Sequence, residues 1–284
     1  MSISVVIPTY NAIKHINTLL SRLFEQSYIP DEVFVVDSDS TDGTQEIIRE
    51  YNNVSLITIN KADFDHGGTR HMAFLETKGD YVVFLTQDAL PYPDFIEKIL
   101  EPFIDRRVAV VTGCQVARKD ATVREKYTRQ AKYPDHDIIR TKADVSKFGI
   151  KTFFTTDVCS AYRREAYFLI GGFDNPCRTM EDIIFGARAI NSGWSIYYKA
   201  TAKVLHSHNF TLRQLYNRNF EIGASIAERM DIFKDVGIAS EGFKEVQIVA
   251  KHLFLKGHWI ELLWYCLECF VRFFANRKGK TYVI

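Results

Sequence analysis

Short apolar runs alternate with amphipathic helical patterns as far as Thr112, and this alternation constrains the fold more than any other feature of the sequence. Five runs have the length and composition of buried strands: Ile3–Ile7, Val33–Val36, Val54–Ile59, Tyr81–Leu85 and Val108–Thr112. Between them, helical patterns are centred near Leu20, end near Tyr51 and begin near Gly68. The alternation predicts an α/β fold, a mostly parallel sheet flanked by helices, with ligands at the carboxyl ends of the strands.

The second half has a less regular pattern. Residues 118–149 are polar and charge-rich, and we expect an extended loop there with a helix around Val123–Ala131. Further helices are predicted over Arg163–Ile170, from Glu181 and from Thr211 onward, with a strand over Ser195–Leu205.

The charge balance argues against a nucleic-acid-binding protein, and the cysteine spacing argues against a zinc site. The 36 Lys and Arg residues balance 35 Asp and Glu residues, which removes bulk electrostatics as an argument for nucleic-acid binding. Cys266 and Cys269 form the one C-x-x-C pair, without a second pair to complete a zinc site, so we expect core or interface thiols. A strand-like run begins almost at Met1 without a basic leader, and this favours a reducing cytoplasm.

Three acidic residues lie where predicted strands end. Asp37 and Asp39 are either acceptors for a nucleoside's base and ribose or turn and cap residues before a helix. Asp88 is either an anchor for a Mg²⁺ or Mn²⁺ ion beside phosphate oxygens or a solvated loop residue.

The heptad from Phe64 to Arg70 combines Asp65, His66, two glycines and an arginine just before a helix. Gly67 and its neighbour would let backbone amides approach an anion, and Arg70 could form a forked pair with phosphate. Asp65 and His66 could hydrogen-bond a base or sugar. The other interpretation is a tight turn, which also uses paired glycines.

Two further segments carry titratable groups. Glu181 and Asp182 open a helix, where they either complement the helix dipole or supply a general base. His206 and His208 follow a strand and are either cation ligands or packing residues.

Taken together, these segments resemble the inverting family-2 glycosyltransferases of the GT-A fold. Ser4-Val5-Val6-Ile7-Pro8-Thr9-Tyr10-Asn11 is similar to the family's opening strand, and the segment from Val36 to Thr44 is similar to its second acidic motif. Thr86-Gln87-Asp88-Ala89 takes the place of the D-x-D motif, with one carboxylate in place of two, and Glu181-Asp182 matches the E-D pair. The Q-x-x-R-W element is absent, and Arg218 lies nearby. The heptad and His206-Ser207-His208-Asn209 look most like bacterial rhamnosyltransferases that use dTDP-L-rhamnose in cell-surface polysaccharide assembly.

The resemblance implies a role for each candidate residue and covers about residues 2–225, which we expect to form the catalytic domain, with residues 226–284 as a helical extension. Asp182 would be the base, and Asp88 with His206 would hold Mg²⁺ or Mn²⁺. Acceptor contacts are assigned to Asp157, Cys159 and Glu181. Donor contacts are assigned to Thr9, Asp37, Asp39, Asp65, His66, Gly67, Arg70, Gln87 and Arg218. Transfer would proceed by a single displacement with inversion.

The C-terminal segment has a composition of its own. His252–Ala275 is rich in aromatic residues and is followed by Arg277 and Lys278, which suits either a helix on an anionic membrane surface or a dimer or domain contact. The membrane version would place the protein on the inner face of the cell membrane and suit a lipid-linked acceptor.

Alternatives to a rhamnosyltransferase are a transferase using another donor such as a UDP-hexose, a nucleotidyltransferase, or an inactive sugar-nucleotide-binding subunit.

Overall fold

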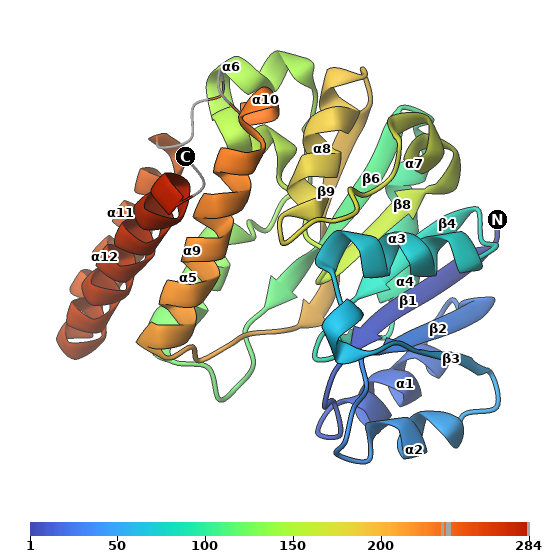
Figure 1. The fold of residues 1–284 in the computed structure, drawn as a ribbon. Coiled ribbons are helices and arrows are strands. Elements are labelled where there is room, and N and C mark those ends of the chain that lie inside the picture. Colours follow the sequence, from blue (N-terminus) through green and yellow to red (C-terminus); the bar gives the residue numbers. More distant parts are fainter. Residues whose placement is uncertain (234–235, 237–239, 283–284) are drawn as a thin grey trace.

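The computed structural model describes residues 1–233, 236 and 240–282, and confirms the α/β fold with helices on both faces of a mostly parallel sheet (Figure 1). The strands are β1 (Ile3–Thr9), β2 (Glu32–Asp37), β3 (Val54–Thr58), β4 (Tyr81–Leu85), β5 (Leu90–Pro91), β6 (Val108–Val116), β7 (Ile138–Arg140), β8 (Cys159–Arg163) and β9 (Ser195–Leu205). The helices are α1 (Ile16–Phe24), α2 (Thr44–Arg49), α3 (His66–Glu76), α4 (Phe95–Leu100), α5 (Val123–Lys132), α6 (Val145–Phe148), α7 (Arg164–Ile170), α8 (Glu181–Asn191), α9 (Leu212–Glu228), α10 (Met230–Phe233), α11 (Ser240–Leu255) and α12 (Trp259–Tyr282).

One sheet runs through the molecule in the order β3-β2-β1-β4-β8-β6-β9-β5, with β7 paired to β9. β1, β2, β3 and β4 are mutually parallel, and β6 and β9 run in the same direction as these four. The inserted β8 and the short strands β5 and β7 run antiparallel to their neighbours. The carboxyl ends of β1, β2, β4, β6 and β9 therefore share one edge of the sheet, which is where ligands bind in such folds.

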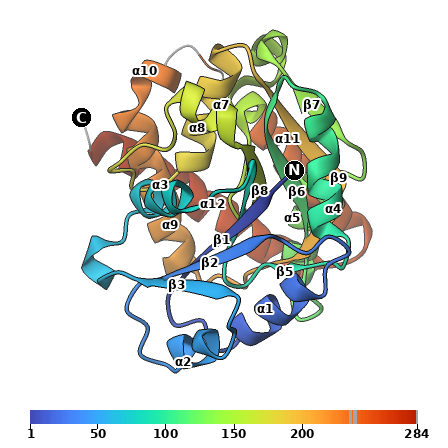
Figure 2. The ribbon, with the colours of Figure 1, turned by 90° about the vertical axis from the view of Figure 1, so that its right-hand side faces the viewer.

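Each face of the sheet has its own apolar core because successive strand side chains point to opposite faces. Ile3, Val5 and Ile7 of β1 pack with α1 and α4 on one face, whereas Val6 packs with α3, α7 and α8 on the other. Figure 2, turned by 90°, shows these helices on the two sides of the sheet. The central strands β1, β4 and β6 are buried on both faces, which explains their continuous apolar runs in the sequence, whereas the edge strand β3 is only half-buried.

The structure corrects two expectations about the elements and adds a strand that was not predicted. β6 continues past the predicted end at Thr112 to Val116, and it carries the polar residue Gln115 near its end. Residues 118–149 hold β7 and α6 besides the predicted helix, so they are not an extended loop. The helix predicted to begin at Arg163 is preceded by a buried strand, β8, in which Ser160, Tyr162 and Arg163 obscure the apolar pattern.

The C-terminal part is helical as predicted. Gly257 takes a positive φ of 74° and turns the chain between α11 and α12. α12 packs along α9, where a Cβ on Gly279 would lie 2.0 Å from the carbonyl oxygen of Phe220 and a Cβ on Gly223 would lie 2.1 Å from that of Asn276. The two glycines therefore permit a close crossing of these helices, on the side of the molecule far from β1–β3 (Figure 1). The expected domain boundary at residue 225 falls inside α9 and stays a prediction.

Candidate active site

Three potential metal ligands meet where β4 and β9 end. His206 Nε2 lies 3.5 Å from Asp88 Oδ1, and His208 Nε2 lies 3.6 Å from Asp88 Oδ2. The three ligand atoms all lie within 4.8 Å of one another. The sequence assigned Asp88 and His206 as ligands and left His208 open between ligand and packing residue. In the structure, the segment after β9 brings both imidazoles to the same carboxylate.

A buried side chain determines which nitrogen of His206 faces Asp88. His206 Nδ1 lies 2.8 Å from Gln115 Oε1, and the same oxygen accepts a hydrogen bond from Arg129. Because a guanidinium only donates, this atom of Gln115 is the amide oxygen, so His206 Nδ1 must donate to it. A neutral His206 then presents the lone pair of Nε2 toward Asp88, which is the tautomer that metal binding requires.

The protonation states also suit a cation. Burial lowers the pKa of His206, and burial reinforced by His206 lowers the pKa of His208 to about 4. Burial opposes ionisation of Asp88. At the acidic pH where this carboxyl titrates, however, hydrogen bonding and charge from the protonated His206, with smaller contributions from His208 and Thr86, hold the pKa of Asp88 well below the ordinary value. At neutral pH the cluster is therefore a carboxylate with two neutral imidazoles, and it needs to lose no proton to bind a metal.

The cluster opens on a cavity of about 380 Å³ whose other walls are rich in cations. Arg129 and Lys132 project from α5, Arg218 projects from α9 and Arg272 comes from α12. Arg129 is paired with Glu125, whereas Arg218 is exposed and, among the described residues, has no carboxylate within ion-pair distance. Arg218, which the sequence assigned to a phosphate, is thus a cation at the cavity that has no acidic partner in the described chain.

The predicted base lies beside the same cavity. Asp182 Oδ2 accepts a hydrogen bond from the backbone nitrogen of Asp157 (3.3 Å), and the adjacent Thr156 lines the cavity. Burial, with repulsion from Glu181 and Asp157, raises the pKa of Asp182 well above its usual value. The carboxylate is therefore a stronger base than a solvated aspartate.

The positive charge of Arg70 offsets the negative charges of two buried carboxylates, Asp157 and Glu181. Its Nε lies 3.4 Å from Asp157 Oδ2, and its NH1 lies 3.3 Å from Glu181 Oε1. Arg70 is 5% exposed, Glu181 5% and Asp157 3%, and Cys159 is fully buried on β8. All four residues, which the sequence assigns to donor or acceptor contacts, lie beneath the site's surface. Asp157 and Glu181 act directly on Asp182, and Arg70 pairs with both of them.

The start of α3 differs from the anion cradle that the sequence suggested. Asp65 caps the helix by accepting from the backbone nitrogens of Gly68 (2.7 Å) and Cys177 (2.8 Å), and the amide of Gly67 donates to Cys177 O (3.3 Å). A Cβ on Gly67 would lie 2.2 Å from the carbonyl oxygen of Asp174. The glycines therefore serve close packing of the helix on the 174–177 segment, and their amides already have protein acceptors. His66 is exposed at the helix start.

Asp37 and Gln87 hold the loops at the strand ends. Asp37 is fully buried and accepts from the side chains of Thr9 (3.0 Å), Ser40 (2.6 Å) and Gln45 (2.7 Å). Gln87 accepts from the backbone nitrogen of Tyr10 (2.7 Å) and donates to its carbonyl oxygen (3.2 Å). In the structure, both residues order the loops around the site.

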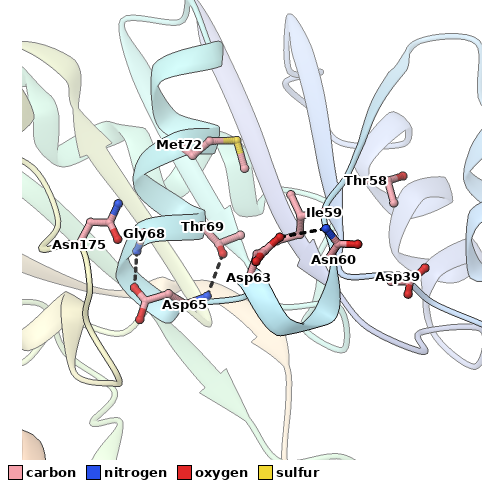
Figure 3. A pocket seen from close by; sticks show the side chains of 10 residues that line it. All are labelled: Asp39, Thr58, Ile59, Asn60, Asp63, Asp65, Gly68, Thr69, Met72 and Asn175. Carbon is pink, nitrogen blue, oxygen red and sulfur yellow. Dashed lines mark hydrogen bonds between the residues drawn. The ribbon is translucent and has the colours of Figure 1, made fainter.

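A second cavity, of about 490 Å³, lies between the end of β3 and the start of α3 (Figure 3). Asp39, exposed and with a positive φ of 61°, lies at one end, and Asp65, Gly68 and Asn175 lie toward the other. Asp39 thus borders an open cavity, as expected of a residue that contacts a nucleoside, and that role stays a prediction.

Gln115, Arg129 and Lys132 were missed by the sequence reasoning. One signal was available for Gln115, a polar residue placed near the end of an otherwise apolar strand. Arg129 and Lys132 are three residues apart on a helix that was predicted, but only the tertiary structure turns that face toward the cavity.

Comparison with known proteins identifies relatives over the whole chain. Residues 4–168 match the profile of glycosyl transferase family 2. The O-antigen chain rhamnosyltransferase RfbN of Salmonella typhimurium is 36% identical over 287 residues, spanning 99% of this chain and 90% of that protein. WbaN of Salmonella anatum, also an O-antigen chain rhamnosyltransferase, is 36% identical over 98% of this chain and 89% of that protein.

Solved structures share the fold at lower identity. PcManGT, a mannosyltransferase from Pyrobaculum calidifontis solved with GDP-Man and Mn²⁺, superposes with a TM-score of 0.65 and 18% identity, covering 99% of this chain and 87% of that one. TarS from Staphylococcus aureus, solved with UDP, superposes with a TM-score of 0.57 and 21% identity over 89% of this chain and 71% of that one. The predicted GT-A fold is thereby confirmed.

Proposed function

The chain belongs to glycosyl transferase family 2, and from this premise we propose that it is an inverting rhamnosyltransferase that uses dTDP-L-rhamnose. The two Salmonella relatives support the choice of sugar, since their similarity extends over nearly the whole chain. The acceptor we propose is a hydroxyl of a lipid-linked saccharide in the cytoplasmic assembly of a cell-surface polysaccharide. Residues 1–225 form the catalytic unit of the proposal, and residues 226–284 form a helical extension.

The observation that carries the catalytic proposal is the cluster of Asp88, His206 and His208 at a cation-rich cavity. A nucleoside diphosphate brings two phosphates that need positive charge, and Arg218 and Lys132 can supply it from two sides of the cavity. The nucleoside itself would extend past Gln87 and Thr9 toward Asp39 and the cavity of Figure 3.

The three clustered side chains fit a divalent cation. Ligands of one ion, at bond lengths of about 2.0–2.2 Å, are at most about 4.4 Å apart, close to the spread of these atoms. Bound there, the cation would supply electrostatic stabilisation of the departing nucleoside diphosphate. Two imidazole nitrogens beside one carboxylate favour Mn²⁺ over Mg²⁺, since Mg²⁺ prefers oxygen ligands alone.

Asp182 is the proposed base. Its carboxylate would take the proton of the acceptor hydroxyl as that oxygen attacks the anomeric carbon from the face opposite the leaving group, which inverts the configuration. The Asp157 backbone nitrogen orients Asp182, and Arg70 balances the charge of the neighbouring Asp157 and Glu181. A positioned base of this kind contributes about 10²–10⁴-fold to the rate.

Donor hydrolysis tests the proposal without a known acceptor. The full chain is incubated with dTDP-L-rhamnose, UDP-glucose or UDP-N-acetylglucosamine, with Mn²⁺, Mg²⁺ or EDTA, and release of nucleoside diphosphate is measured. We expect dTDP-L-rhamnose to be the preferred donor, Mn²⁺ to act at lower concentration than Mg²⁺, and Asp88→Asn to lose turnover. Asp94→Asn, a matched change at an exposed carboxylate on the start of α4, should keep it.

The alternatives give different results in this assay and in a parallel incubation with a nucleoside triphosphate and a sugar phosphate. Preference for a UDP-sugar would replace the proposed donor while leaving the cation site intact. Binding of sugar nucleotides without hydrolysis under any cation would indicate an inactive binding subunit. Consumption of a nucleoside triphosphate with a sugar phosphate would indicate a nucleotidyltransferase and refute glycosyl transfer.

A further inference from the structure

The helical hairpin formed by α11 and α12 exposes a large apolar surface that no part of the chain described by the structure covers. Ile260 is 75% exposed, Leu263 72% and Phe273 68%. We call the whole surface the hairpin face, and it consists of Phe254, Leu255, Trp259, Ile260, Leu263, Trp264, Leu267, Phe270, Phe273 and Phe274. Contiguous apolar patches of this kind mark interaction sites rather than ordinary protein surface.

The hairpin face follows the period of α12. Ile260, Leu263, Leu267, Phe270 and Phe274 recur three or four residues apart, so they form one stripe about 21 Å long at 1.5 Å per residue. The opposite side of α12 is buried against the body of the protein through residues such as Tyr265, Ala275 and Gly279. The helix is therefore packed on one side and apolar on its free side as well.

Acidic residues of the hairpin are turned toward the protein. Glu261 and Glu268 pair with Arg124 of α5, each at 2.6 Å. Glu245 pairs with Lys151 at 2.6 Å. Among the hairpin side chains that the structure describes, no Asp or Glu is exposed.

Basic residues, by contrast, surround the hairpin face. Lys251 and Lys256 are exposed at its α11 side, and Arg277 and Lys278 are exposed toward the end of α12. An apolar stripe with a basic border complements a surface that is apolar within and negatively charged at its boundary. It does not complement a second copy of itself, because the border is basic at both ends and a two-fold contact would bring one basic border against the other.

We propose that the hairpin face is a membrane-docking surface that lies in the headgroup region of an anionic lipid bilayer. No helix in the described chain is long and apolar enough to cross a membrane, which agrees with a helix lying along the surface. The aromatic side chains enter the boundary of the acyl region, while Lys256, Arg277 and Lys278 pair with lipid phosphates.

Docking by the hairpin face brings the catalytic cavity to the membrane. Arg272 of α12 and Glu245 of α11 line the cavity that the Asp88 cluster opens on, so the hairpin is both the docking element and one wall of the site. An acceptor anchored in the bilayer would then reach the cavity along α12. This inference goes beyond the proposed reaction, and vesicle binding requires neither donor nor acceptor, so its failure would leave glycosyl transfer untouched.

Vesicle co-sedimentation of the full chain tests the proposal. Vesicles of phosphatidylcholine with phosphatidylglycerol should pellet the protein, and vesicles of phosphatidylcholine alone should pellet much less. L263E/F270E should lower the partition coefficient at least about 100-fold, since two apolar side chains no longer leave water. K256Q/R277Q/K278Q should lower binding to the anionic vesicles at least about tenfold and lose the preference for anionic lipid.

A matched control distinguishes docking from general surface effects. I104E/L169E makes the same chemical change at two exposed apolar residues away from the hairpin (92% and 71% exposed) and should bind vesicles like the wild type. All variants should retain donor hydrolysis, which reports folding. Equal pelleting of the wild type and L263E/F270E would overturn the proposal. So would a wild-type dimer in sedimentation velocity that L263E/F270E makes monomeric, without vesicle binding by either.

Discussion

Gln115→Leu should weaken cation binding although residue 115 would not touch the ion. Gln115 is 2% exposed, and its Oε1 accepts hydrogen bonds from both His206 Nδ1 and Arg129. Leucine fills similar volume but leaves the imidazole N–H without an acceptor when Nε2 faces Asp88. An unsatisfied buried donor costs about 1–3 kcal/mol, which corresponds to an affinity loss of about five- to 150-fold. Loss of a residue that orients a metal ligand typically costs about 10–100-fold, in agreement with this range.

The measurement is Mn²⁺ affinity of the protein alone, by calorimetry or by the electron paramagnetic resonance signal of free Mn²⁺. Gln115→Glu keeps an acceptor at the same place and should bind Mn²⁺ at least as well as the wild type, whereas Gln115→Leu should not. A thermal unfolding curve for each variant separates loss of the site from loss of the fold. Mn²⁺ affinity of Gln115→Leu within twofold of the wild type would refute the role assigned to this hydrogen bond.

Three further predictions concern the base and the hairpin. Asp182→Asn should lower the turnover of glycosyl transfer by about 10²–10⁴-fold. Donor binding, measured by calorimetry with the nucleoside diphosphate, should stay nearly intact. A variant that keeps most of its turnover would show that Asp182 is not the base. Glu181→Gln removes a negative charge that raises the pKa of Asp182, so Asp182 should ionise more easily. The acid limb of the pH profile of kcat/KM should therefore move to lower pH. If this limb does not move, another group determines it. Gly279→Ala would place a Cβ 2.0 Å from the carbonyl oxygen of Phe220 and should lower the free energy of unfolding by about 1–3 kcal/mol in chemical denaturation. Lys278→Ala, at the exposed neighbouring residue, should change this free energy little. Equal unfolding curves for the two variants would mean that α9 and α12 are not closely packed.

The local pattern of apolar and polar residues was sufficient to predict most of the parallel strands of the sheet. β1, β2, β3, β4 and β9 were predicted to within a few residues. β1 and β4 are buried on both faces and leave continuous apolar runs, whereas β9 shows an alternation of polar and apolar residues over much of its length. β8 was missed because it alternates polar and apolar residues over only five positions, and β7 was missed because it has only three residues. The pairing of both is decided by distant strands. The sequence also predicted that Asp88 and His206 lie at the same edge of the sheet, because each follows a strand and parallel strands bring their carboxyl ends to a common edge.

The sequence by itself thus determined the α/β fold, the placement of acidic and imidazole groups at the strand ends and the resemblance to the family. Only the tertiary structure decided how those groups are used. It joins His208 to Asp88 and His206, sets the tautomer of His206 through Gln115, and turns Arg70 inward toward Asp157 and Glu181. The physical reason is that strand periodicity is a local property of the chain, whereas hydrogen-bond partners and burial depend on residues far apart in sequence.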